Sequence, residues 1–218
     1  PLRGVALPPR SYEPADYTAF LEQAAAGLDI VMWAGDWLEI TQEHGGPVAI
    51  ETMAAQFGFL PLAELSIHHD GNLVHPFDEA NRALFVAQTV AYAAAYQPPY
   101  LGLGIEINTL HENHPDDFDA FVSLFNEAAA GVRAASPATR VFTCFQLEKM
   151  KGYAFWVDGP PDPDLAQWDL VGLFDADLIA FTTYPGLVFR DSADIPDDYY
   201  TGILDRVDGP VIFTEIGW

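Results

Sequence analysis

The chain has 218 residues, of which 50% are hydrophobic, and 32 acidic against 9 basic residues give it a formal net charge of −23. This length and apolar content suffice for one core, so the sequence predicts a single domain over residues 1–218. The negative charge would repel a phosphate backbone, which argues against nucleic acid as a partner. No run of about 18 uncharged apolar residues is present, so no membrane span is expected. Cys144 is the only cysteine, which excludes an internal disulfide.

Apolar stretches typical of buried strands alternate along the chain with stretches typical of helices. The expected strands are Arg3–Leu7, Asp29–Ala34, Ala63–His68, Tyr100–Ile107, Arg140–Leu147, Asp177–Tyr184 and Pro210–Ile216. The expected helices are Pro14–Ala26, Pro47–Phe57, Phe77–Tyr96, Pro115–Ala135, roughly Asp164–Phe174, and Pro196–Val207. Such alternation predicts a parallel sheet, because parallel strands need long crossover connections.

These units predict an α/β fold of the (β/α)8 or TIM-barrel type. Seven strands are counted and the chain ends at Trp218, so the barrel is expected to lack its eighth strand and to be C-terminally incomplete. The alternative is an open doubly wound sheet, which usually carries a Gly-rich phosphate loop after its first strand. Residues 5–12 contain no such loop. The Gly-x-Gly at 102–104 lies inside an expected strand and lacks a third glycine, so close packing explains it better.

Polar and aromatic residues gather where the expected strands end, which is where barrels of this type place their chemistry. Hydrolysis of a glycosidic bond needs one carboxyl group to protonate the leaving oxygen and another to attack the anomeric carbon or activate water. Glu106 and Glu215 each end a compact apolar run, on the fourth and seventh expected strands. They are the candidate catalytic pair.

Aromatic residues at the same end would suit a sugar ligand. Trp37 and Trp218 have faces that could stack on the apolar side of a pyranose. Tyr184 could hydrogen-bond one carboxylate and keep it ionised. No metal ion or other cofactor is needed for this chemistry.

The remaining candidates for substrate contact are polar. Asn108 and Gln146 could bind sugar hydroxyl groups, and Asn108 is expected to share a strand face with Glu106 because the two residues are two positions apart. Gln146 and Glu148 share a face for the same reason. The other expected contacts are Asp36 and His68.

The phrases Gly-Ile-Glu-Ile-Asn at 104–108 and Thr-Glu-Ile-Gly-Trp at 214–218 resemble those of the retaining (β/α)8 glycoside hydrolases of clan A. Shorter matches lie at 33–37, 146–148 and 183–185. Within the clan, the sequence looks most similar to the endo-β-1,4-galactanase type. The resemblance implies that Glu106 is the acid/base, that Glu215 is the nucleophile and that Tyr184 contacts the nucleophile. It also implies an oligo- or polysaccharide substrate. Ile105 departs from the pattern, because the clan usually has an Asn there that contacts the sugar 2-hydroxyl.

Two other functions fit the same sequence. Ile105 would suit a carbohydrate-binding barrel without turnover. His68 or His69 would suit a metal-dependent barrel hydrolase, although neighbouring strand residues point to opposite faces and both could not easily hold one ion. The first residues have no basic region followed by a long apolar region, so no secretory signal is expected and the localisation stays open, although secretion would suit polysaccharide breakdown.

Overall fold

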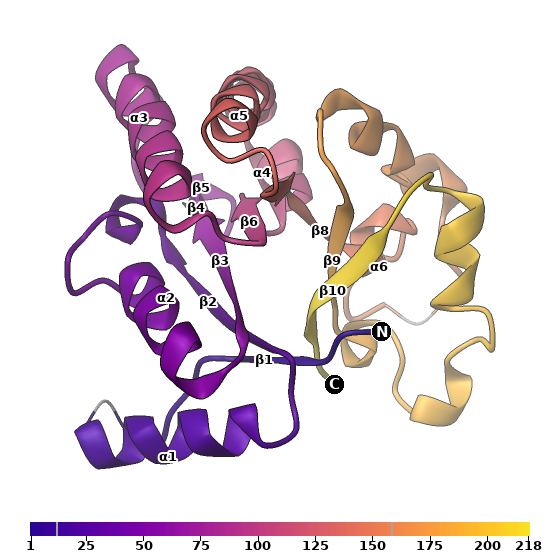
Figure 1. The fold of residues 1–218 in the computed structure, drawn as a ribbon. Helices are drawn as coiled ribbons and strands as arrows, with labels where there is room; N and C mark the ends of the chain where they lie inside the picture. Colours follow the sequence, from indigo (N-terminus) through magenta and orange to yellow (C-terminus); the bar gives the residue numbers. More distant parts are fainter. Residues whose placement is uncertain (12, 158) are drawn as a thin grey trace.

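A computed structural model describes residues 1–11, 13–157 and 159–218 (Figure 1). Its strands are β1 (Gly4–Ala6), β2 (Ile30–Asp36), β3 (Leu60–Ser66), β4 (His68–His69), β5 (Asn72–Leu73), β6 (Tyr100–Leu103), β7 (Arg140–Phe142), β8 (Cys144–Gln146), β9 (Ile179–Thr183) and β10 (Val211–Ile216). Its α-helices are α1 (Pro14–Ala25), α2 (Gly46–Phe57), α3 (Glu79–Tyr96), α4 (Ile107–Asn113), α5 (Pro115–Ala135) and α6 (Leu147–Met150). The 3-10 turns are η1 (Trp37–Glu39), η2 (Pro163–Leu165), η3 (Trp168–Leu173), η4 (Pro185–Leu187), η5 (Ser192–Asp194) and η6 (Thr201–Asp205).

The main strands are parallel and follow one another in chain order. One sheet has the order β1-β2-β3-β6-β7, and a second has the order β8-β9-β10. β7 and β8 are separated only by Thr143, and the Cys144 N–H donates to the Gly104 carbonyl at 2.9 Å, so the ladder continues across the break. The prediction of an α/β barrel with seven strands is confirmed.

The ring of strands is not closed in the described part of the chain, because β10 and β1 have no strand between them and do not pair. Both edge strands are partly exposed, whereas every residue of β9 is buried. In Figure 1 the two ends of the chain lie on the same side of the molecule, next to these edges.

Helices cover the outside of the first sheet, as Figure 1 shows for α2, α3 and α5. The longest, α5, begins with a proline and has two acidic residues in its first turn, which suits the positive end of the helix dipole. Its buried face carries Phe118, Phe121 and Phe125, as the sequence predicted. These rings meet Phe174 with centroids 5.1–6.1 Å apart. They belong to the core between sheet and helices.

Two expected helices are wrong. The segments 164–174 and 196–207 form only short 3-10 turns, η2, η3 and η6. Each segment contains a glycine, Gly172 or Gly202, and glycine costs about 1 kcal/mol in a helix interior. Helices this short need strong packing to persist.

The observed strand limits differ most from the predicted ones at β3 and β6, the two strands that carry or precede site residues. β3 starts at Leu60 and ends at Ser66, so it begins three residues before the predicted strand. β6 ends at Leu103, because Gly104 turns the chain with φ +111°. The prediction of a strand continuing to Ile107 is therefore wrong, and Glu106 lies in the turn that follows the strand.

Candidate active site

The turn between β6 and α4 places Glu106 in a left-handed backbone conformation, with φ +48° and ψ +41°. Gly104 makes the turn possible, because a Cβ there would lie 2.7 Å from both Ile107 Cγ2 and the Phe121 ring. The left-handed region costs a non-glycine residue about 1–2 kcal/mol. Strain of this kind concentrates at functional sites.

Neighbouring groups hold Glu106 in this conformation. Its carbonyl oxygen accepts from the Thr109 N–H at 2.8 Å and lies 3.1 Å from His68 Nε2. His68 Nδ1 accepts from the Gly71 N–H at 3.2 Å, which leaves the ring proton on Nε2 as the donor to Glu106. Both ring nitrogens of His68 are thus used within the fold, and its side chain holds the Glu106 turn instead of facing a ligand.

The Glu106 carboxyl group faces Glu215 on β10. Thr182 donates from Oγ1 to Glu106 Oε1 at 2.6 Å. Thr182 is also the register partner of Glu215 across β9 and β10. The two glutamates, which are 109 positions apart by their numbers (215 − 106), therefore converge at the carboxyl end of the barrel, and both are partly buried.

Burial raises the pKa of Glu106, and the charge of Glu215 raises it further. The Thr182 hydrogen bond and the charge of Lys149 act in the opposite direction. The raised pKa favours a protonated Glu106, which is the form that a general acid needs.

Glu215 is turned by a bulge in β10, where the register with β9 shifts between Phe213 and Glu215. Bulges beside active sites re-aim a side chain. Tyr184 donates its hydroxyl to Glu215 Oε2, as the sequence predicted. Gly217 makes room for the Tyr184 ring, since a Cβ there would lie 2.6 Å from the ring carbon Cε1.

Trp218 is exposed. Its side chain is 63% exposed, and its ring packs so near Gly186 that a Cβ there would lie 3.4 Å from it. Gly186 belongs to η4, which directly follows Tyr184. The indole therefore lies close to the tyrosine that contacts Glu215.

Trp37 does not fit its predicted role as a stacking platform. Its side chain is 1% exposed and packs edge-on against Phe85 and His75. The neighbouring Asp36 accepts from the Leu38 N–H at 3.0 Å and lies 2.8 Å from His75 Nε2. Asp36 thus starts η1 and pairs with a histidine that sequence reasoning did not single out.

Asn108 lies on α4, so the expectation that it shares a strand face with Glu106 is wrong. The side chain is fully buried, and its amide binds the Gln146 backbone in both directions, at 3.0 Å to the carbonyl and 2.9 Å from the N–H. It also donates to Gln167 Oε1 at 3.0 Å. Asn108 thus holds α4 against the end of β8 and does not face a ligand. The Gln146 side chain is also buried, with 4% of its surface exposed.

Glu148 is also fully buried, which is at odds with contact to substrate. Its Oε1 accepts from the Thr183 hydroxyl at 2.8 Å, the Tyr184 N–H at 3.0 Å and the Tyr199 hydroxyl at 2.7 Å. Glu148 therefore fixes the backbone of Tyr184, whose side chain then reaches Glu215.

The structure adds a third acid, Glu64, that sequence reasoning missed. Glu64 lies in the middle of β3, is fully buried, and has no hydrogen-bond partner for either carboxyl oxygen within the described residues. Burial, and next the charge of Glu215, raise its pKa to about 8. A single acid within the apolar run from Leu60 to Leu65 was the available signal.

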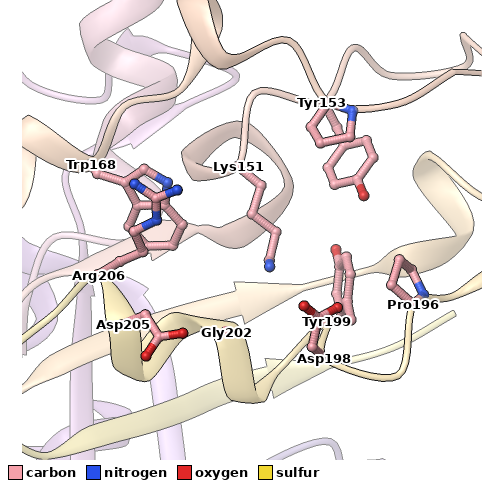
Figure 2. A pocket seen from close by; sticks show the side chains of 10 residues that line it. Lys151, Tyr153, Trp168, Pro196, Asp198, Tyr199, Gly202, Asp205 and Arg206 are labelled. Atoms are coloured by element: carbon pink, nitrogen blue, oxygen red, sulfur yellow. The ribbon is translucent and has the colours of Figure 1, made fainter.

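A cavity of about 500 Å³ lies apart from these carboxyl groups, between the segment after α6 and η6 (Figure 2). None of the predicted site residues lines it. Figure 2 shows the Lys151 side chain extending into the cavity, and its Nζ lies 4.7 Å from the centroid of the Tyr199 ring. Tyr199, which donates to Glu148, is the link between this cavity and the candidate site.

Over residues 1–11, 13–157 and 159–218, no three His, Cys, Asp or Glu side chains come together in a way that could hold a metal ion. The His69 side chain is 86% exposed beside Asp70, on the hairpin of β4 and β5. Within the same ranges, no helix has the length and apolar content needed to cross a membrane.

Comparison with known proteins identifies the fold. No family model and no curated protein matches the chain. Among solved structures, the GH53 catalytic domain of Ignisphaera aggregans matches 94% of this chain at 17% identity, with a TM-score of 0.59. A β-glucosidase from Thermotoga maritima in complex with glucoimidazole matches 92% at 12% identity, with a TM-score of 0.57. The exo-β-1,4-mannosidase Op5Man5 from Opitutaceae bacterium strain TAV5 matches 100% at 12% identity, with a TM-score of 0.54.

The chain spans 60%, 66% and 52% of the length of those three chains, respectively. At such low identities the likeness establishes the architecture, a (β/α)8-type barrel. It does not distinguish one sugar specificity from another.

Proposed function

We propose that the protein is a glycoside hydrolase that cleaves a β-glycosidic bond with retention of configuration. The observation that carries this proposal is the convergence of Glu106 and Glu215, because Thr182 binds the first and pairs in register with the second. The two carboxyl groups have different surroundings, burial at Glu106 and a tyrosine hydroxyl at Glu215. That difference suits one acid and one nucleophile. Structural likeness to a β-glucosidase and an exo-β-1,4-mannosidase supports the same class.

The reaction proceeds in two steps. The Glu215 carboxylate attacks the anomeric carbon while Glu106 gives its proton to the leaving glycosidic oxygen, which forms a glycosyl ester and releases the first product. Glu106, now a carboxylate, takes a proton from water as the water oxygen attacks the anomeric carbon. The ester bond breaks and the Glu215 carboxylate is restored.

The substrate in this proposal is an oligo- or polysaccharide that is bound partly by stacking on the exposed Trp218. No cofactor takes part. A β-1,4-galactan is the first polymer to test, because the sequence phrases at 104–108 and 214–218 look closest to the galactanase type.

The test is hydrolysis of aryl β-galactosides, β-glucosides and β-mannosides and of β-1,4-galactan by the wild-type chain and by Glu106→Gln and Glu215→Gln. Glu127→Gln, at an exposed position on α5, is the matched control. We expect turnover with at least one substrate, a loss of about 10³-fold or more in either site variant, and no change in the control. Equal activity in Glu215→Gln and Glu127→Gln would contradict the proposal.

A second function, carbohydrate binding without turnover, is favoured by Ile105. This apolar residue precedes Glu106, at the position where the clan A hydrolases that the sequence resembles usually have an Asn. Saccharide binding in a calorimeter, with no hydrolysis of any test substrate and no effect of Glu215→Gln on affinity, would establish binding alone.

A further inference from the structure

The interior of the barrel is layered, and Glu64 lies above an apolar layer. A small cluster of Met32, Leu62, Phe142, Cys144, Leu178 and Ala180 fills the space enclosed by the strands. Side chains two positions apart on a strand share a face, so Glu64 points to the same interior as Leu62. Its register partners, Ala34 and Gly102, carry little or no side chain.

Gly102 makes room for this acid. A Cβ at Gly102 would lie 2.8 Å from Glu64 Cγ and 2.9 Å from the Phe142 ring. The neighbouring strand therefore has a glycine where any larger residue would push the Glu64 side chain out of its place. The missing side chain at Gly102 therefore leaves room in the barrel interior for the side chain of Glu64.

The groups that act on Glu64 come from β8, from β10 and from the turn after the neighbouring strand β6, and none is a cation. They are the carboxyl groups of Glu215 and Glu106, the Cys144 thiol and the Thr214 hydroxyl. Cys144 Sγ and Thr214 Oγ1 lie 3.3 Å from each other. Both act on Glu64 as weak hydrogen-bond partners that lower its pKa, although neither Glu64 oxygen has a partner at full hydrogen-bond geometry. An ionised carboxylate in such a place would be unsolvated and would face no cation, so the pKa of Glu64 is raised to about 8 and the group is neutral below that pH.

We propose that Glu64 is a positioning residue of the catalytic centre, a buried carboxylic acid beneath Glu106 and Glu215 that is neutral at the pH of turnover and so keeps the charge at this end of the barrel to that of a single carboxylate. The inference rests on the proposed function and extends it to a third residue. An ionised Glu64 would bring a second negative charge to this end of the barrel, where Glu215 is the proposed nucleophile. The neutral form carries a polar O–H without that charge.

Two substitutions separate charge from polarity. Glu64→Gln keeps the shape and a neutral polar group, so kcat/KM at pH 6 should stay within about threefold of wild type. Glu64→Met keeps the length but loses the polar group, so kcat should fall at least tenfold with little change in KM. Circular dichroism confirms that each variant is folded. Equal kcat in both variants would show that the carboxyl group only fills space and would overturn the inference.

The pH profile gives a readout that a space-filling role would not move. Above the pKa values of Glu106 and Glu64, two ionisations should lower wild-type kcat/KM, with a limiting slope of about −2 on a logarithmic plot. Glu64→Gln has only the Glu106 ionisation and should show a slope of about −1. Superimposable alkaline limbs for the two proteins would contradict the inference.

A titration that needs no substrate separates this inference from the proposed function. With ¹³C-labelled glutamate, the wild-type spectrum should contain one carboxyl resonance that titrates near pH 8 and that is missing from Glu64→Gln. If this resonance is present but no glycoside is hydrolysed, the proposed function fails, and with it the catalytic role of Glu64. If hydrolysis occurs while the Glu64 resonance titrates below pH 6, this inference alone is overturned.

Discussion

Replacing Glu64 by glutamine should make the protein more stable at alkaline pH, because the buried acid penalises the folded state there. The pKa of Glu64 is raised from 4.5 to about 8 on folding. Between these values the unfolded chain releases the Glu64 proton and the folded chain keeps it, so stability falls as pH rises. Above about pH 8 both states are ionised and the loss is complete.

The magnitude follows from the size of the shift. A span from 4.5 to about 8 is about 3.5 pKa units, and each unit corresponds to about 1.4 kcal/mol. The loss is then of the order of 5 kcal/mol, which is a large part of the typical 5–15 kcal/mol of a folded domain. Glu64→Gln carries no such loss.

Urea unfolding at pH 5 and pH 8.5 provides the assay. We expect the free energies of unfolding of wild type and Glu64→Gln to be similar at pH 5 and to diverge by several kcal/mol at pH 8.5, with the variant more stable and the denaturant slope unchanged. Burial also raises the pKa of Glu51 to about 7, but Glu51 is present in both proteins and its effect cancels. The control Glu127→Gln should follow wild type. Free energies that change in parallel from pH 5 to pH 8.5 would refute the reasoning.

Three further variants test how the carboxyl groups are positioned. Gly217→Ala should displace the Tyr184 ring and lower kcat/KM about 10- to 100-fold, the equivalent of one hydrogen bond to a charged group. Gly172→Ala, where a Cβ meets no atom within 4 Å, should leave it unchanged, and equal effects of the two would contradict the role of Gly217. His68→Leu removes the donor to the strained Glu106 backbone, so kcat should drop at least tenfold with KM nearly constant; a rise in KM alone would instead indicate ligand contact. Trp218→Ala should raise KM for oligosaccharides several-fold more than for aryl glycosides, and an unchanged KM would exclude stacking at this indole.

The sequence predicted the parts of the fold that depend on local patterns. Alternating apolar and amphipathic stretches defined seven strands in the right order and the long helices up to residue 135. The last third of the chain was harder to predict, because the segments near Gly172 and Gly202 had helical composition but form 3-10 turns.

The candidate site was predicted where a side chain follows its strand directly. Glu215 and Tyr184 lie at strand ends and hydrogen-bond as expected. Glu106 was found for a partly wrong reason, because the positive φ of Gly104 ends the strand before it. The same turn moves Asn108 onto a helix, where it is buried.

Burial could not be predicted from strand position. Trp37 follows a strand end but turns into the core, because the space between η1 and α3 accepts a large ring. Glu64 was missed because β3 begins at Leu60, which places Glu64 inside the strand and away from the strand end that marked the other candidates. Both errors concern tertiary packing, which a local pattern does not encode.

The central claim is that Glu215 forms a covalent bond to the sugar, and trapping of that intermediate tests it most directly. The wild-type chain would be treated with an activated 2-deoxy-2-fluoro β-glycoside of the best substrate, digested and analysed by mass spectrometry. We predict the added mass of one fluorosugar on the peptide that contains Glu215, and no labelling in Glu215→Gln. Efficient hydrolysis without a trapped adduct, or an adduct on another residue, would contradict the mechanism.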